Sequence, residues 1–274
     1  MGKSDLVRLV ALAAIWGASF MFIRVLSPVI GPWATAESRV LLGGAVLVAY
    51  AGALRRHAEL RQFWRVYVVV GAVNSAVPFA LFAFAALHLP ASYLAILNSS
   101  TPLFAALLAA VWLNEPLTRP KVVGITCGCA GVILVSKTGP VVPDVMFAWA
   151  VAASLGAAFC YAAAGIYLRR TAAHAPPLAV AGWSQLAAAG LLLPGLLASG
   201  RPLPTATLRD PLVIADVVAL AVVCSALAYV LYYRLMRDIG PMRTLTVTFL
   251  IPLFGMLWGR MFLDETITVS MVLG

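Results

Sequence analysis

The sequence predicts an all-α polytopic membrane protein whose ten transmembrane helices form a 5+5 inverted-topology repeat. Three observations lead to this fold class. The 274 residues are 63% hydrophobic and 11% charged, with a mean hydropathy of +0.99, which leaves too few polar side chains to cover a soluble domain. Apolar stretches of about twenty residues, the length that crosses a hydrocarbon core, recur along the whole chain. A motif of the first half also returns in the second half.

Ten apolar stretches are expected to be helices, because short segments rich in Pro, Gly and charged residues separate them. The last stretch ends at Gly274 and is too short to cross a membrane, so we expect either a longer natural chain or a trimmed one. The predicted spans are residues 6–26, 33–54, 66–87, 92–113, 121–136, 146–168, 178–198, 212–233, 243–263 and a tenth from 267.

The basic residues are distributed unevenly between the two ends of these spans. If the N-terminus is cytoplasmic, that side carries 13 Lys and Arg residues and the opposite side carries 5, with Arg39 left over near the start of the second span. Because positive residues collect in cytoplasmic loops, we expect a protein of the bacterial inner membrane with both termini in the cytoplasm. The net charge of +9 does not indicate a nucleic-acid partner, since the basic residues are scattered over many short loops.

Neither a metal nor another cofactor is expected. The four cysteines lie inside apolar stretches, and Cys127 and Cys129 are two residues apart, so they face different directions on a helix. We expect all four to be small buried side chains, without a disulfide.

The recurring motif occupies residues 100–118 and returns in residues 251–268. When the chain is shifted by 150 positions, seven of seventeen aligned residues are identical, among them a proline inside the apolar run and a glutamate after it. Chance similarity between two Leu-rich helices is the alternative, but the match is closer than shared hydrophobicity explains. The identical pairs are Pro102 with Pro252, Leu103 with Leu253, Phe104 with Phe254, Leu107 with Leu257, Leu113 with Leu263, Glu115 with Glu265 and Thr118 with Thr268.

This duplication predicts two five-helix halves, an N-terminal repeat over residues 1–137 and a C-terminal repeat over residues 138–274. Because five is an odd number, the second half must enter the membrane in the opposite sense to the first. Inverted repeats are typical of transporters, whose two halves enclose a site and open it alternately to each side.

At these residues the chain resembles the drug/metabolite transporter superfamily, in its EamA family. The resemblance rests on AAIWGASFMFIR at residues 13–24, on Arg39, on STPLFAALLAAVWLNEPLT at residues 100–118 and on the second copy of that motif. Within the family the chain is similar to aromatic amino-acid exporters of the YddG type. The resemblance implies a ten-helix exporter of amino acids or other small metabolites.

Polar and aromatic side chains in helices three, four, eight and nine, with others from helices one and six, are candidates for the wall of a solute-binding cavity. Uncharged polar groups are costly when they face lipid, so they should face protein or water. For each residue, hydrogen bonding or packing between helices is the alternative role. The candidate substrate-binding residues are Trp16, Ser19, Asn74, Pro78, Phe79, Phe82, Asn98, Thr101, Tyr161, Tyr229, Tyr232, Thr248 and Phe249.

Pro102 and Pro252 fall near the middle of the fourth and ninth spans. A proline inside a helix removes one backbone hydrogen bond and bends the helix. The pair is therefore expected to kink two helices at related depths, either as gates of the cavity or as structural bends without a gating role.

Charged residues are expected to be absent from the membrane midplane. Those within the spans, Arg39 included, lie within about two turns of a span's end, where a charge can reach the interface. Carriers of phosphorylated solutes would present a cation, and proton antiporters would present a buried carboxylate. We therefore expect a neutral or zwitterionic solute with an apolar part, and Glu37 is the remaining candidate for proton coupling.

These features favour export of small neutral or zwitterionic metabolites, above all aromatic or hydrophobic amino acids, by alternating access through a cavity between helices 3, 4, 8 and 9. An intramembrane enzyme is disfavoured, since no HExxH or GxSxG motif and no pair of intramembrane aspartates occurs. A receptor or scaffold would have no obvious use for an inverted repeat. The expected partners are a small solute and the lipid bilayer. The chain is expected to be a monomer, and the alternative is a dimer through the GxxxG groove at Gly124 and Gly128.

Overall fold

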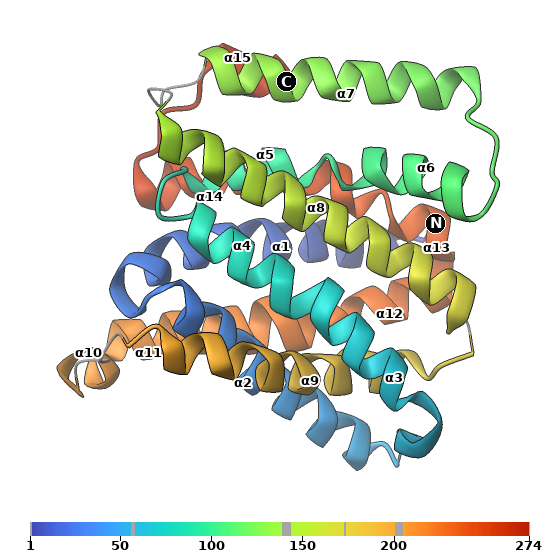
Figure 1. Cartoon of the computed structure of the whole chain (residues 1–274), viewed down its shortest axis with the longest axis vertical. Helices are drawn as coiled ribbons and strands as arrows, with labels where there is room; N and C mark the ends of the chain where they lie inside the picture. Colours follow the sequence, from blue (N-terminus) through green and yellow to red (C-terminus); the bar gives the residue numbers. More distant parts are fainter. Residues whose placement is uncertain (1, 56–57, 139–143, 173, 201–204, 274) are drawn as a thin grey trace.

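The computed structural model describes residues 2–55, 58–138, 144–172, 174–200 and 205–273, and the regular elements within these ranges are all helices. Figure 1 shows the long helices crossing the molecule side by side. The N-terminal part contains α1 (Lys3–Ile30), α2 (Pro32–Ala53), α3 (Leu60–Gly71), the π-helical segment η1 (Ala72–Ala76), α4 (Val77–Ala85), α5 (Ala91–Asn98), α6 (Thr101–Trp112) and α7 (Arg119–Thr138).

The C-terminal part repeats the same succession of long, interrupted and broken helices. It also has a short additional helix, α10, before the interrupted span. The elements are α8 (Val145–Thr171), α9 (Pro177–Ala198), α10 (Thr205–Arg209), α11 (Pro211–Val218), the π-helical segment η2 (Ala219–Leu227), α12 (Ala228–Ile239), α13 (Pro241–Thr244), α14 (Val247–Leu263) and α15 (Val269–Leu273).

Seven helical spans in the described part of the chain are long and apolar enough to cross a membrane, so the protein is polytopic. They coincide with the first four predicted spans and with the sixth to the eighth. The ninth forms α14, which is apolar but has 17 residues, and the fifth and tenth coincide with α7 and α15. The seven spans are Lys3–Ile30, Pro32–Ala53, Leu60–Ala85, Ala91–Trp112, Val145–Thr171, Pro177–Ala198 and Pro211–Ile239.

Proline, glycine and aspartate define several helix ends. Gly31 ends α1 with a φ of 87°, and Pro32 begins α2 in the next residue. Glycine adopts a positive φ without steric cost, and proline at the first helical position has no N–H that needs a partner. Asp144 caps α8, since its carboxylate accepts a 2.6 Å hydrogen bond from the Phe147 amide. Boundaries with such signals lie close to the predicted ones, as at the start of α2 and of α8, whereas the third span begins six residues earlier and the eighth ends six residues later than predicted.

Two predicted spans are interrupted by π-helical segments at related positions. A shift of 150 residues moves η1, at residues 72–76, onto residues 222–226, which lie within η2 at residues 219–227. A π-helical segment adds a residue to the turn and changes the direction in which later side chains point. Such segments are frequent at functional sites.

The fourth predicted span is broken rather than kinked. The helix α5 ends at Asn98 and α6 begins at Thr101, so Pro102 lies in the first turn of a new helix, where its missing N–H has no helical partner to lose. Pro252, in contrast, lies inside α14. The expectation of a proline in mid-helix is therefore met at Pro252 and not at Pro102.

The two parts of the chain are packed together by helices that approach closely at small residues. Direct neighbours include α2 with α9, α1 with α14, α3 with α9 and α14 with α5. Where α3 crosses α9, a Cβ placed on Gly71 would lie 2.5 Å from the Ser184 carbonyl oxygen, so only glycine allows the two backbones to come this close.

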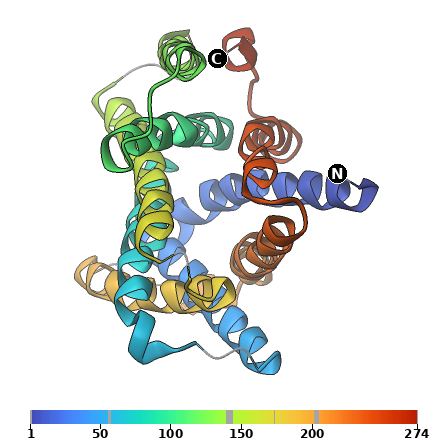
Figure 2. The same cartoon turned by 90° about the vertical axis from the view of Figure 1, so that its right-hand side faces the viewer.

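Figure 2 shows α7 and α15 next to each other at one edge of the molecule, away from its centre. Gly128 of α7 packs against α6, since a Cβ there would lie 2.3 Å from Leu103 Cδ1, whereas Gly124 has no neighbour within 4 Å. This position also corrects the expectation for the cysteines. Cys127 and Cys129 are exposed because α7 is peripheral, while Cys224 of η2 is buried.

Candidate functional site

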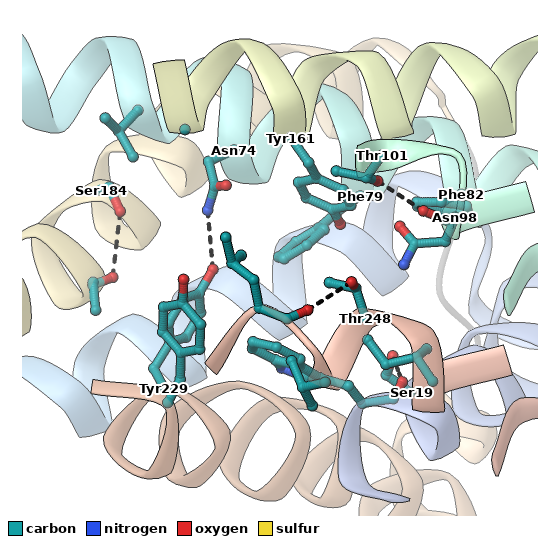
Figure 3. A pocket seen from close by; sticks show the side chains of 18 of the residues that line it. Ser19, Asn74, Phe79, Phe82, Asn98, Thr101, Tyr161, Ser184, Tyr229 and Thr248 are labelled. Carbon is teal, nitrogen blue, oxygen red and sulfur yellow. Dashed lines mark hydrogen bonds between the residues drawn. The ribbon is translucent and has the colours of Figure 1, made fainter. Parts of the chain in front are cut away.

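A central cavity of about 280 Å³ lies between helices from both parts of the chain. Figure 3 shows side chains from several helices directed into it. Its wall is formed by α1, α2, the α3–η1–α4 span, α5, α6, α8, α9, α12 and the region from α13 to α14. The volume is close to the lower end of the range for small-molecule sites, roughly 300 Å³.

Aromatic rings form two faces of the cavity. On one side, Trp16 of α1 lies 5.4 Å from Tyr232 and 6.5 Å, edge-on, from Tyr229, both on α12. On the other side, the rings of Phe82 and Tyr161 are stacked at 6.2 Å. Rings held by neighbouring helices present flat apolar surfaces, and a tyrosine adds a hydroxyl. The cavity is therefore suited to a solute with a flat or apolar part.

Some polar side chains of the cavity form hydrogen bonds with each other or with the main chain. Asn74 Nδ2 donates to the Tyr229 hydroxyl at 3.0 Å, which links η1 to α12. The Thr101 hydroxyl donates to the Asn98 main-chain carbonyl at 2.7 Å, and the Thr248 hydroxyl donates to the Leu245 carbonyl at 2.8 Å. Figure 3 shows Asn98, Thr101 and Thr248 on the same side of the cavity.

Among the described residues of the cavity wall, one fully buried acceptor has no hydrogen-bond partner. The side-chain oxygen of Asn98, Oδ1, is buried and accepts no hydrogen bond within the described structure. A buried acceptor without a donor costs free energy, so a small movement that exposes this oxygen to the cavity would let it accept a hydrogen bond from a solute or from water.

The cavity wall carries a cation, which corrects the expectation that the charged side chains within the spans reach back to the interface. Arg39 lines the cavity and is 7% exposed. Its Nε donates to the Ser225 hydroxyl at 3.0 Å, and its guanidinium carbon lies 3.8 Å from the centre of the Phe79 ring. The side chain extends from the first two turns of α2 into the interior rather than back to the interface. This arrangement is possible because α4 and η2 supply an aromatic face and a hydroxyl.

Most of the predicted site residues come together around this cavity. Phe249 does not, because its side chain is 66% exposed on the outside of α14. Pro78, in the first turn of α4, is buried but does not line the cavity, and neither do Pro102 and Pro252. The predicted residues that line it are Trp16, Ser19, Asn74, Phe79, Phe82, Asn98, Thr101, Tyr161, Tyr229, Tyr232 and Thr248.

The sequence interpretation missed some residues of the wall, notably Arg39, Ser184 and Tyr233. A signal existed for Arg39, since an arginine within an apolar span is rarely without function. Ser184 comes from α9, a helix that was not expected to contribute. Hydropathy does not identify which face of α9 meets the centre.

Glu37, the candidate for proton coupling, does not line the cavity. It is buried in α2, and its Oε2 has no hydrogen-bond partner in the described structure. Among the described residues, no group of three or more His, Cys, Asp or Glu side chains is placed to hold a metal ion.

Outside the residues that line the cavity, one contact joins distant parts of the chain. Glu265, between α14 and α15, accepts hydrogen bonds from the Ala91 amide at 2.6 Å, the Ser92 amide at 3.0 Å and the Ser92 hydroxyl at 2.6 Å. These groups form the N-terminus of α5, where unpaired amides and the helix dipole favour an anion. Nearby, Arg24 of α1 donates to the Ala86 carbonyl.

The matching glutamate of the first motif has different partners. Glu115, between α6 and α7, pairs with Arg169 at 2.7 Å and with Lys121 at 3.3 Å. The hydrogen bond from Arg169, followed by that from Lys121, holds the pKa of Glu115 below its ordinary value of 4.5. The two copies of one motif therefore perform different tasks in this conformation.

The ion pairs of Glu115 with Arg169 and Lys121 should make the stability of the protein depend on pH. The pKa of Glu115 is lower in the folded than in the unfolded protein. The ion pair therefore stabilises the folded protein at pH values above the unfolded pKa, near 4.5. It is lost as the pH falls through the folded value. The difference in unfolding temperature between the wild type and Glu115→Gln should be small, since exposed pairs are weak, and should vanish in acid. A difference that grows as the pH falls would contradict this assignment.

The fold and the cavity define a polytopic helical membrane protein built around a solute-sized site. The chain belongs to the EamA-like transporter family, whose model matches residues 6–137 and again residues 148–274. It is therefore an integral membrane transporter of the drug/metabolite superfamily, and its substrate is a small molecule.

Several curated proteins are similar over most of the chain. An uncharacterized transporter, YvbV, of Bacillus subtilis (strain 168) is 24% identical over 264 residues, which cover 96% of this chain and 85% of that protein. The protein PecM of Dickeya dadantii (strain 3937) is 27% identical over 266 residues, or 95% of this chain and 84% of that protein.

A probable terminal-alkyne amino-acid exporter of Streptantibioticus cattleyicolor is 26% identical over 146 residues, which cover 53% of this chain and 49% of that protein. A solved crystal structure has the same fold, with a TM-score of 0.68 and 20% sequence identity, over 100% of this chain and 93% of that one.

Proposed function

We propose that the protein exports small zwitterionic metabolites, above all aromatic or hydrophobic amino acids, by alternating access through the central cavity. The observation that carries this proposal is the cavity itself, whose wall combines stacked aromatic rings with polar side chains from both parts of the chain. One similar protein is named as a probable amino-acid exporter, which supports the same class of solute.

The architecture that we propose for this mechanism is a ten-helix, 5+5 inverted repeat with halves at residues 1–137 and 138–274. Three findings support it. The family model matches the chain twice, the order of long, interrupted and broken helices recurs, and π-helical segments occur at equivalent places. Two related halves of opposite orientation can exchange conformations, which opens a shared site first to one side and then to the other.

We further propose that this conformation faces the cytoplasm. The cavity wall extends to Leu168 and Val180, near the connection between α8 and α9, whereas the contact of Glu265 with the start of α5 lies outside the cavity lining and holds the helix ends together there. The excess of basic residues supports a cytoplasmic position of the α8–α9 connection in a bacterial inner membrane.

Transport can be tested with purified protein in liposomes. We expect vesicles that contain the protein to accumulate labelled phenylalanine, tryptophan or leucine faster than empty vesicles. A panel of other metabolites would identify a different solute. No acceleration with any member of a broad panel would contradict the proposed function.

Variants of the cavity wall test where the solute passes. Tyr229→Ala removes a ring that packs against Trp16 and breaks the hydrogen bond to Asn74, and Asn98→Ala removes the unpartnered oxygen. We expect both to reduce flux about tenfold or more at unchanged membrane abundance. Tyr50→Ala, which removes a tyrosine outside the cavity, is the control. Wild-type flux in both cavity variants would remove these side chains from the path.

A further inference from the structure

We infer that Arg39 is the receptor for an anionic group of the solute, and that this group is a carboxylate. The inference rests on the proposed transport function and narrows its substrate class to compounds that carry a free carboxylate. Neither the family match nor the similar proteins assign a role to this residue.

The position of Arg39 in the cavity is the first step. Its side chain is 7% exposed, lines the cavity from α2, and contacts Phe79 of α4 and Ser225 of η2. Removing an arginine from water is costly unless an anion or several acceptors replace the water. Among the described residues, no acidic side chain forms an ion pair with Arg39, whereas the ion pairs of the chain lie at the helix ends.

The hydrogen bonds of Arg39 leave most of its donors free. A guanidinium has five N–H groups. Only Nε is used in the described structure, at 3.0 Å from the Ser225 hydroxyl. The Phe79 ring, 3.8 Å from the guanidinium carbon, covers one face of the group without satisfying any N–H. The two terminal nitrogens therefore remain for an acceptor with two oxygens, and a carboxylate matches that geometry.

A phosphate is less well matched to this wall. A phosphate monoester carries nearly two negative charges at neutral pH, and a site for it would be expected to gather more than one cation. Arg39 is the only Lys or Arg among the cavity-lining residues that the structure describes. A single guanidinium balances a single negative charge, which fits a carboxylate.

A purely structural role is the competing interpretation. Arg39 joins α2 to η2 through Ser225 and to α4 through Phe79, and these contacts would exist without a solute. The two interpretations differ in one observable. A structural arginine affects binding of all solutes equally, whereas a carboxylate receptor distinguishes an acid from its neutral amide.

The test measures binding to purified full-length protein by the ligand-induced rise in unfolding temperature. The probes are the amino acids phenylalanine, tryptophan and leucine, their amides, and phenylphosphonate. We expect the acids to bind about tenfold or more tightly than the amides, because a charge-assisted contact is lost. Phenylphosphonate should bind more weakly than phenylalanine.

Substitutions of Arg39 test whether this residue causes the tighter binding of acids than of amides. In Arg39→Gln the ratio of acid to amide affinity should fall to about one, and in Arg39→Lys the preference should persist with weaker binding. Arg260→Gln, which removes an exposed arginine outside the cavity, should keep the wild-type ratio. The ratio is insensitive to partial misfolding, since unfolded protein lowers both affinities alike. If Arg39→Gln does not fold, the Arg39→Lys ratio and the wild-type series still decide the question.

Three results would overturn the inference. They are equal binding of acids and amides by the wild type, absence of binding by every acid, and an undiminished preference in Arg39→Gln. Tighter binding of phenylphosphonate than of phenylalanine would show that Arg39 receives a phosphoryl group and not a carboxylate. Each of these results leaves the transport proposal standing if the vesicle panel shows flux, so the two failures are distinguishable.

Discussion

Replacing Gly255 with Ala should lower the unfolding temperature by several degrees and reduce the yield of folded protein. Gly255 lies where α14 crosses α5 and α1, and a Cβ there would lie 2.3 Å from the Ala95 Cβ. On α1, a Cβ at Gly17 would lie 2.9 Å from the Gly255 amide nitrogen. Since an alanine methyl cannot rotate away, the backbones must separate. Overpacking of this kind costs roughly 1–3 kcal/mol. Thermal unfolding in detergent measures the effect.

Gly190→Ala is the matched control, since it adds the same methyl group to an exposed position of α9 with no neighbour within 4 Å. It should leave stability unchanged or raise it slightly, because alanine is the better helix former by about 1 kcal/mol. Equal unfolding temperatures for the two variants would show that the crossing of α14, α5 and α1 has room for a methyl group at Gly255.

Replacing Glu265 with Ala should have a second large effect, on stability and on transport. The carboxylate satisfies the first two amides of α5 and the Ser92 hydroxyl, and Pro90, which precedes α5, makes no side-chain cap. Loss of hydrogen bonds to a charged group costs about 1.5–3 kcal/mol. We expect a lower unfolding temperature and an altered rate of flux. Glu265→Gln, which keeps one acceptor oxygen, should lie between the wild type and Ala.

The duplicated motif supplies the control for this prediction. Glu115→Ala removes the equivalent glutamate, whose partners Arg169 and Lys121 are solvent-accessible. Exposed ion pairs contribute little, so Glu115→Ala should be much milder. An equal loss of stability in both variants would contradict the different roles that we assign to the two glutamates.

Much of the site was predictable because an uncharged polar or aromatic side chain in a membrane span has few places to point. Trp16, Asn98 and Tyr229 were selected on that basis and lie together on the cavity wall. Phe249 was selected with its neighbour Thr248, but consecutive residues of a helix point about 100° apart. Thr248 therefore faces the cavity while Phe249 faces outward.

The depth of a charge was less predictable. Sequence position places Arg39 within two turns of a helix end, where an arginine would ordinarily reach the interface. Its direction depends instead on Ser225, which is 186 residues away in the chain, and on the ring of Phe79. No local pattern in α2 contains this information.

Hydropathy, helix-end residues and the repeated motif are properties of the chain read in order, and they were sufficient for the membrane class, for seven of the ten predicted spans and for the resemblance to a transporter family. The charged cavity wall, the partner of Glu265 and the outward side of α14 depend on which helices become neighbours. Those contacts join segments far apart in the chain, and they set the direction of each side chain through packing that no short stretch of sequence encodes.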